Sequence, residues 1–96
     1  MEPETLLRLR PMRERLEELR KVADTLAVWP SEEARDQWLG RWLLCEQAAL
    51  GDEMPLDVLD TGVAEDFETV VSELRAMRGA ARAAVRDFRR AAPHGG

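Results

Sequence analysis

The sequence predicts an all-α fold, and three observations carry this prediction. Apolar residues recur every three or four positions from residue 67 to residue 88, which is the heptad seam of one continuous, coiled-coil-like helix. A second seam of the same kind spans residues 9–26. Ala and Leu contribute thirteen residues each, whereas Ile and Tyr are absent, and this composition favours helix over sheet.

Both seams are regular over most of their length. The earlier seam consists of Leu9, Met12, Leu16, Leu19, Ala23 and Leu26. The later seam consists of Phe67, Val70, Leu74, Met77, Ala81, Ala84 and Phe88. Because short connections between long helices make neighbouring helices antiparallel, we expect a single domain over residues 1–96 that forms an antiparallel three-helix bundle.

The first helix is predicted over about residues 4–28. Pro11 lies inside this range, so it either kinks the helix or stands in the first turn of a helix that begins near Arg10. The helix ends before Trp29-Pro30, because a residue that precedes proline avoids the α region.

The second helix is predicted over residues 31–50. Ser31 is suited to the N-cap, and Glu32 and Glu33 place negative charge at the positive end of the helix dipole. Gly51 is the expected left-handed residue at the C-terminal end.

The third helix is predicted over residues 63–91, after a connector at 52–62. Within this connector, residues 56–59 are expected to form one short extra helical turn that closes an end of the bundle. Pro93 ends the third helix and leaves a polar tail at residues 92–96.

The size of the chain favours association with another chain. Ordering 96 residues costs about 140 kcal/mol at roughly 1.5 kcal/mol per residue. Only 29 residues are apolar and larger than Ala, so a lone monomer is marginal. We therefore expect a homodimer or a small subunit of a larger assembly.

Several functional classes lack the residues that they need. The one Cys and the one His do not supply a zinc site, and no phosphate-binding loop is present, so we expect no metal, no cofactor and no enzyme. Cys45 is expected to be a small buried apolar residue, and a single Cys fits the cytoplasm. The net charge of −5 argues against nucleic acid, and no segment is apolar enough for a membrane span.

The second helix has more apolar circumference than one buried face requires. Trp38 and Trp42 lie on one side of it, and Leu39 and Leu43 lie roughly 100° away. Tryptophan is common in cores and is also enriched at interface hot spots. Both interpretations remain open for each tryptophan, and we take these four residues as candidate anchors for a protein partner.

Charge is segregated along the chain. Residues 31–66 contain ten acidic residues and two arginines, whereas residues 67–96 contain six arginines and three acidic residues. Five arginines follow one another at helical spacing beside the later seam: Arg75, Arg78, Arg82, Arg86 and Arg89. Three interpretations are a solvated stripe that pairs with acidic residues of a neighbouring helix, a contact with an acidic protein, and a contact with phosphates.

The function that these patterns favour is non-catalytic protein binding through the second helix. Trp38, Leu39, Trp42 and Leu43 are the expected anchors, and Arg78, Arg82 and Arg86 are the expected polar rim. The alternative is a small acidic inhibitor or regulator of a nucleic-acid-handling complex that acts through its charged surfaces.

Overall fold

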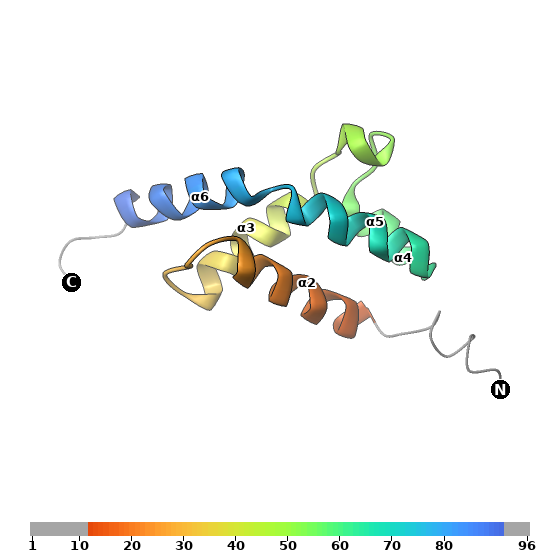
Figure 1. The fold of residues 1–96 in the computed structure, drawn as a ribbon, viewed down its shortest axis with the longest axis horizontal. Helices are drawn as coiled ribbons and strands as arrows, with labels where there is room; N and C mark the ends of the chain where they lie inside the picture. The colour runs from red at the N-terminus through yellow and green to blue at the C-terminus, as the bar shows by residue number, and fades with distance from the viewer. Residues whose placement is uncertain (1–11, 92–96) are drawn as a thin grey trace.

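The computed structural model describes residues 12–91, and over this range the chain is all-helical, as predicted. The described residues form five α-helices and one 3-10 helix, and Figure 1 shows how they are arranged. In chain order they are α2 (Met12–Leu26), α3 (Glu32–Leu43), η1 (Ala48–Leu50), α4 (Pro55–Asp60), α5 (Ala64–Arg75) and α6 (Arg78–Ala91). Residues 1–11 and 92–96, with the predicted kink at Pro11 and the polar tail, lie outside the described residues.

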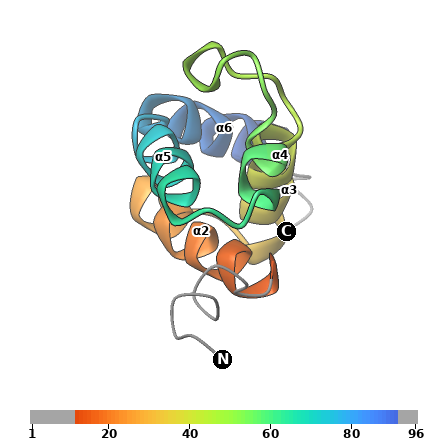
Figure 2. The same ribbon diagram turned by 90° about the vertical axis from the view of Figure 1, so that its right-hand side faces the viewer.

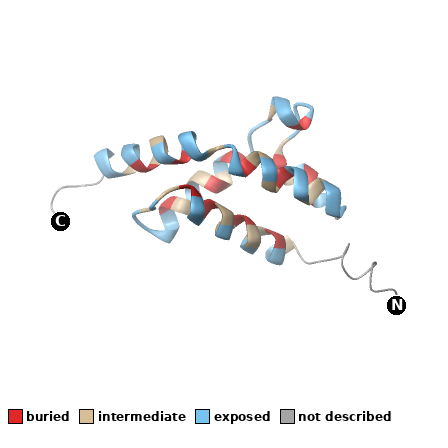
Figure 3. Cartoon of the chain, in the orientation of Figure 1, coloured by how far each residue is buried: buried red, intermediate tan, exposed pale blue. Residues whose placement is uncertain are grey.

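Helix α2 supplies the central apolar surface of the fold. Leu19, Ala23 and Leu26 are buried on one side of it, so this part of the earlier seam is confirmed. This helix packs against α3, α4, α5 and α6, and the end-on view in Figure 2 shows the other helices surrounding a common interior. Figure 3 shows that the buried positions lie on the inward faces of the helices.

The second predicted helix is shorter than expected. Ser31 is its N-cap, as predicted, and its side chain accepts a hydrogen bond from the backbone N–H of Ala34. However, α3 ends at Leu43, and the prediction of a helix up to residue 50 was wrong. The chain then turns, and η1 returns Leu50 to the core beside α5, which a helix continuing straight on would not achieve.

Left-handed residues form the turn after η1. Gly51 has a φ of 69°, as expected for this residue, but it closes η1 rather than the second helix. Asp52 follows with a φ of 63°, a conformation that Asp tolerates better than most residues. The backbone N–H of Gln47 donates to the carbonyl of Glu53 at 3.1 Å, so the turn is closed like a small hairpin.

The short helix in the connector is confirmed as α4. Pro55 opens it at the first turn, where a proline loses no helical hydrogen bond. Val58 and Leu59 are buried beneath α5, and Gly62 then turns the chain with a φ of 73°.

The third predicted helix is divided in two, and the prediction of one continuous helix over residues 63–91 was wrong. The backbone leaves the α-helix at Ala76 and Met77, where the N–H of Met77 donates to Leu74 at 2.9 Å. Gly79 is the second residue of α6, and a glycine near this point lowers the helix propensity of the segment. The seam itself is confirmed across the joint, since every one of its positions is buried or half-buried.

One charged residue lies among the apolar ones. The Arg15 side chain shares the inward face of α2 and is only 9% exposed. Its Nε has no hydrogen-bond partner in the described part of the chain. A buried donor without a partner costs stability, because it has lost its hydration and gained no protein bond in return.

We therefore expect Arg15→Met to raise the free energy of unfolding by about 1 kcal/mol, since Met fills similar space without a buried charge. Leu19→Ala, on the same face, is expected to lower it by about 2–4 kcal/mol. Urea denaturation followed by circular dichroism measures both values. A destabilised Arg15→Met variant would mean that the guanidinium has a stabilising partner.

Candidate functional site

A four-residue ion network joins α2 to α3. Arg35 Nη1 on α3 donates to both carboxylate oxygens of Asp24 on α2, each at 3.1 Å. Arg35 Nε also donates to Asp36 at 3.1 Å, and Arg20 Nε of α2 lies 3.4 Å from the same carboxylate. The network fixes how α3 leaves the turn after α2.

Burial and two neighbouring carboxylates act in opposite directions on the pKa of Arg35. Its side chain is only 11% exposed, and burial of the guanidinium acts to lower the pKa. The hydrogen bonds to Asp24 and Asp36 outweigh burial, so the pKa of Arg35 is raised above its ordinary value.

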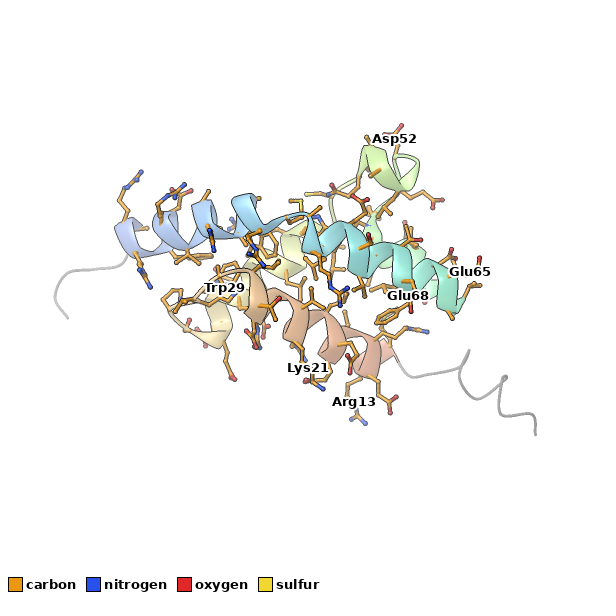
Figure 4. All side chains as sticks on the ribbon, in the orientation of Figure 1. Arg13, Lys21, Trp29, Asp52, Glu65 and Glu68 are labelled. Carbon is orange, nitrogen blue, oxygen red and sulfur yellow. The ribbon has the colours of Figure 1, made fainter. Side chains whose placement is uncertain are left out.

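The turn between α2 and α3 carries an aromatic cluster. The indole N–H of Trp29 donates to the carbonyl of Ala23 at 2.9 Å and so caps the end of α2. The Trp29 ring lies 5.4 Å from that of Trp38 on α3 and 6.5 Å from that of Phe88 on α6, centroid to centroid. Figure 4 shows Trp29 at the end of α2, next to α6.

Beside this cluster, α3 and α6 enclose a hollow of about 240 Å³, which we call the aromatic cleft. Its lining residues are Trp38, Arg41, Ala84, Asp87, Phe88 and Ala91. Trp38 and Phe88 are both half-buried, so each presents ring surface to the outside. Most of this lining is apolar, with one positive and one negative group beside it, which suits an apolar side chain of a protein partner.

Three of the four candidate anchors lie in the core of the chain itself. Leu39, Trp42 and Leu43 are buried against the other helices, so they offer little area to another chain. Trp38 alone among the four remains partly accessible. The broad apolar surface of the second helix is thus covered mainly by α2, α4 and α6 of the same chain.

The predicted arginine rim is exposed on α6. Arg78, Arg82 and Arg86 make no ion pair with any residue that the structure describes, so the expected pairing with a neighbouring helix is wrong within residues 12–91. Arg82 and Arg86 line a groove of about 360 Å³ between α6 and the end of α2. We call this the arginine groove, and it consists of residues 24–28 with Arg82, Val85, Arg86 and Arg89.

A third hollow, between α3 and α4, has the opposite charge. Its lining includes Glu46, Asp52, Glu53 and Asp57. Figure 4 shows Asp52 on the turn that projects from the helices. No cluster suited to a metal ion exists in the described part of the chain.

Cys45 also lines this acidic hollow, and the structure leaves it exposed. The expectation of a buried Cys45 was wrong, because α3 ends before it and the chain turns away from the core. Leu44, its neighbour, is 60% exposed for the same reason.

Sequence reasoning missed the contribution of the turn after α2. Val28 is 78% exposed, the most exposed large apolar residue described, and it stands on the rim of the arginine groove. Phe88 was recognised only as part of the seam. A Trp-Pro pair directly after an amphipathic helix was the available signal that this turn is built around an aromatic side chain.

Residues 25–80 match a protein family described as the antitoxin Xre/MbcA/ParS C-terminal toxin-binding domain. The match covers more than half of the 96 residues. The chain belongs to this family. The Xre/MbcA/ParS C-terminal domain is a non-catalytic, helical binding domain, and a protein is its partner. Searches of curated proteins and of solved structures each gave no match.

The matched segment runs from the end of α2 to the start of α6. It contains the α3 side of the aromatic cleft, with Trp38 and Arg41, whereas Phe88 lies beyond it. In this member of the Xre/MbcA/ParS family, the aromatic cleft is therefore formed by residues within the matched segment together with residues that follow it. None of the helices within residues 12–91 has the length and apolar character needed to cross a membrane.

We expect the ion pair between Asp24 and Arg35 to stabilise the folded chain by about 0.5–1 kcal/mol, since Asp24 is exposed while Arg35 is nearly covered. A double-mutant cycle with Asp24→Ala and Arg35→Ala, followed by urea denaturation, measures this coupling. The coupling should decrease in high salt. Additive effects of the two substitutions would show that the pair does not hold α3 to α2.

Proposed function

We propose that the chain neutralises a protein toxin by binding it and forms no covalent bond with it. One observation carries this proposal, namely the match of residues 25–80 to a toxin-binding antitoxin domain.

The aromatic cleft is the surface that we propose for the toxin. It holds Trp38, the one candidate anchor that is still accessible, and it lies between two helices that the fold keeps in place. A half-buried aromatic ring beside a charged Arg41 is typical of an interface hot spot with its polar rim. The other three candidate anchors support this surface indirectly, because they hold α3 in the core: Leu39, Trp42 and Leu43.

The remaining parts of the sequence-based hypothesis stay predictions. A homodimer was expected to form through the second helix, and light scattering at micromolar concentration would detect it. A cytoplasmic location and the alternative role in a nucleic-acid-handling complex likewise stay predictions, without a specific contact that favours them. We propose the toxin as the occupant of the aromatic cleft, because the anchors that a dimer needed are mostly buried.

A growth assay tests the proposed function. The protein encoded by the neighbouring gene is expressed from an inducible promoter, alone and together with this chain. We expect growth to stop with the neighbouring protein alone and to resume when the chain is present, and we expect the two proteins to elute as one complex in size-exclusion chromatography. Growth arrest without rescue, and without a complex, would contradict the proposal.

Substitution of Trp38 tests the proposed surface. We expect Trp38→Ala to weaken toxin binding by about 2 kcal/mol or more, roughly 30-fold, as measured by isothermal titration calorimetry. Val63→Ala is the matched control, because Val63 is an exposed apolar residue outside the cleft.

Because Trp38 also contacts Trp29, the unfolding temperature of each variant is recorded before binding is measured. Arg41→Glu provides a second test, since Arg41 is exposed and its replacement should leave the fold intact. Full affinity in both Trp38→Ala and Arg41→Glu would place the toxin elsewhere on the chain.

A further inference from the structure

The positive charge on α6 is not neutralised within the described chain. Five arginines stand on this helix, and among the described residues only Arg90 has an acidic partner, Asp87, at 3.9 Å. Arg82, Arg86 and Arg89 are exposed and lie within one groove. The one acidic residue that lines the same groove is Asp24, which Arg35 already binds.

The groove is also apolar along its floor. Leu26 and Val85 are buried beneath it, and Val28 stands on the rim with most of its side chain in solvent. Three guanidinium groups beside an apolar strip are complementary to a segment that carries both carboxylates and an apolar side chain. Arginine is suited to this role because its planar group binds a carboxylate through two hydrogen bonds.

Two other occupants fit the groove less well. Nucleic acid would be repelled by the acidic residues 31–66, which follow the groove directly in sequence, and it would leave the apolar strip unused. The acidic hollow of a second copy has the right charge, but a head-to-tail contact between these two different surfaces closes only as a ring or continues as an open chain. A protein partner with an acidic segment has neither difficulty.

We infer that the arginine groove binds an acidic, partly apolar segment of the protein partner, an inference that rests on the proposed function and adds the chemistry of the partner. Carboxylates of this segment bind Arg82, Arg86 and Arg89, and an apolar side chain packs against Val28. All four residues on the α6 side of the groove lie beyond the matched residues 25–80. The groove thus confers partner specificity that the family-wide segment alone does not encode.

The test uses a defined probe and does not require the toxin. The probe is a fluorescein-labelled helical peptide of about 14 residues, with Leu at every third or fourth position and Glu elsewhere. Fluorescence anisotropy measures its affinity for the full chain, and amide shifts in nitrogen-15 spectra locate the contact. We expect shifts at Val28 and along α6 from Arg82 to Arg89, and we expect affinity to fall as NaCl rises from about 50 to 500 mM.

Charge reversal in the groove supplies the decisive comparison. Arg82→Glu combined with Arg86→Glu should weaken peptide binding about tenfold or more. Arg75→Glu combined with Arg78→Glu is the matched control, since it changes the charge equally on the same arginine series but outside the groove. Because a reversed charge beside the end of α2 can itself unfold the chain, Arg82→Gln combined with Arg86→Gln is measured alongside.

Five outcomes would overturn the inference. The first four are no binding of the peptide, equal losses of affinity in the groove and control variants, equally tight binding of a matched peptide with Gln in place of Glu, and tighter binding of duplex DNA of similar length. A fifth is a loss of stability in the Gln variant without a loss of affinity, which would mean that the arginines serve only the end of α2.

The peptide experiment tests the arginine groove independently of the growth assay, which tests the proposed function. If the chain does not rescue growth but binds the acidic peptide specifically, the proposed toxin partner is rejected and the inference about the arginine groove is retained. If the charge-reversed variant rescues growth fully and the peptide does not bind, the proposed toxin partner is retained and the inference about the arginine groove is rejected.

Discussion

The fold depends on covering the apolar face of α2. Leu19, Ala23 and Leu26 form a continuous buried strip on this fifteen-residue helix. No single neighbour covers the strip, so α3, α4, α5 and α6 each contact a part of it. Because burial of apolar surface is the main source of stability, the turns after α2 and α3 and the joint after α5 follow from the need to bring four short helices to one strip.

This arrangement also places the two surfaces that we propose for partner binding. The end of α2, the middle of α3 and the last turn of α6 come together around Trp29, which contacts the rings of both Trp38 and Phe88. The aromatic cleft lies on one side of α6, and the arginine groove lies on the other. One helix therefore presents an apolar contact surface and a positively charged one, and the aromatic cluster holds it in place.

The sequence alone was sufficient for the fold class and for the inward faces of the helices. The seam positions of α2, α5 and α6 are buried or half-buried. Residues three or four positions apart lie on one face of any α-helix, so the spacing alone identifies the inward face. The ends of helices were harder to predict. Helix α3 ends at Leu43 and α5 ends at Arg75, and neither end has a proline or a left-handed glycine as its cap.

The site was predictable only where local sequence determines it. Arg82 and Arg86 were correctly recognised as exposed because their helical spacing separates them from the seam. Trp42 and Trp38 follow the same spacing, yet one is buried and the other borders a cleft. That difference depends on where α6 lies across α3, and α6 is about forty residues away along the chain, so no pattern within the second helix encodes it.

The joint at Ala76 and Met77 sets the rotational phase of α6. One residue fewer in this joint would turn every side chain of α6 by about 100° about the helix axis. Ala81 and Val85 would then leave the interior, and arginines would face it in their place. Chain length between Leu74 and Ala81 is therefore constrained more tightly than the residue types that fill it, and natural insertions and deletions should be rarer there than in the turn around Asp52.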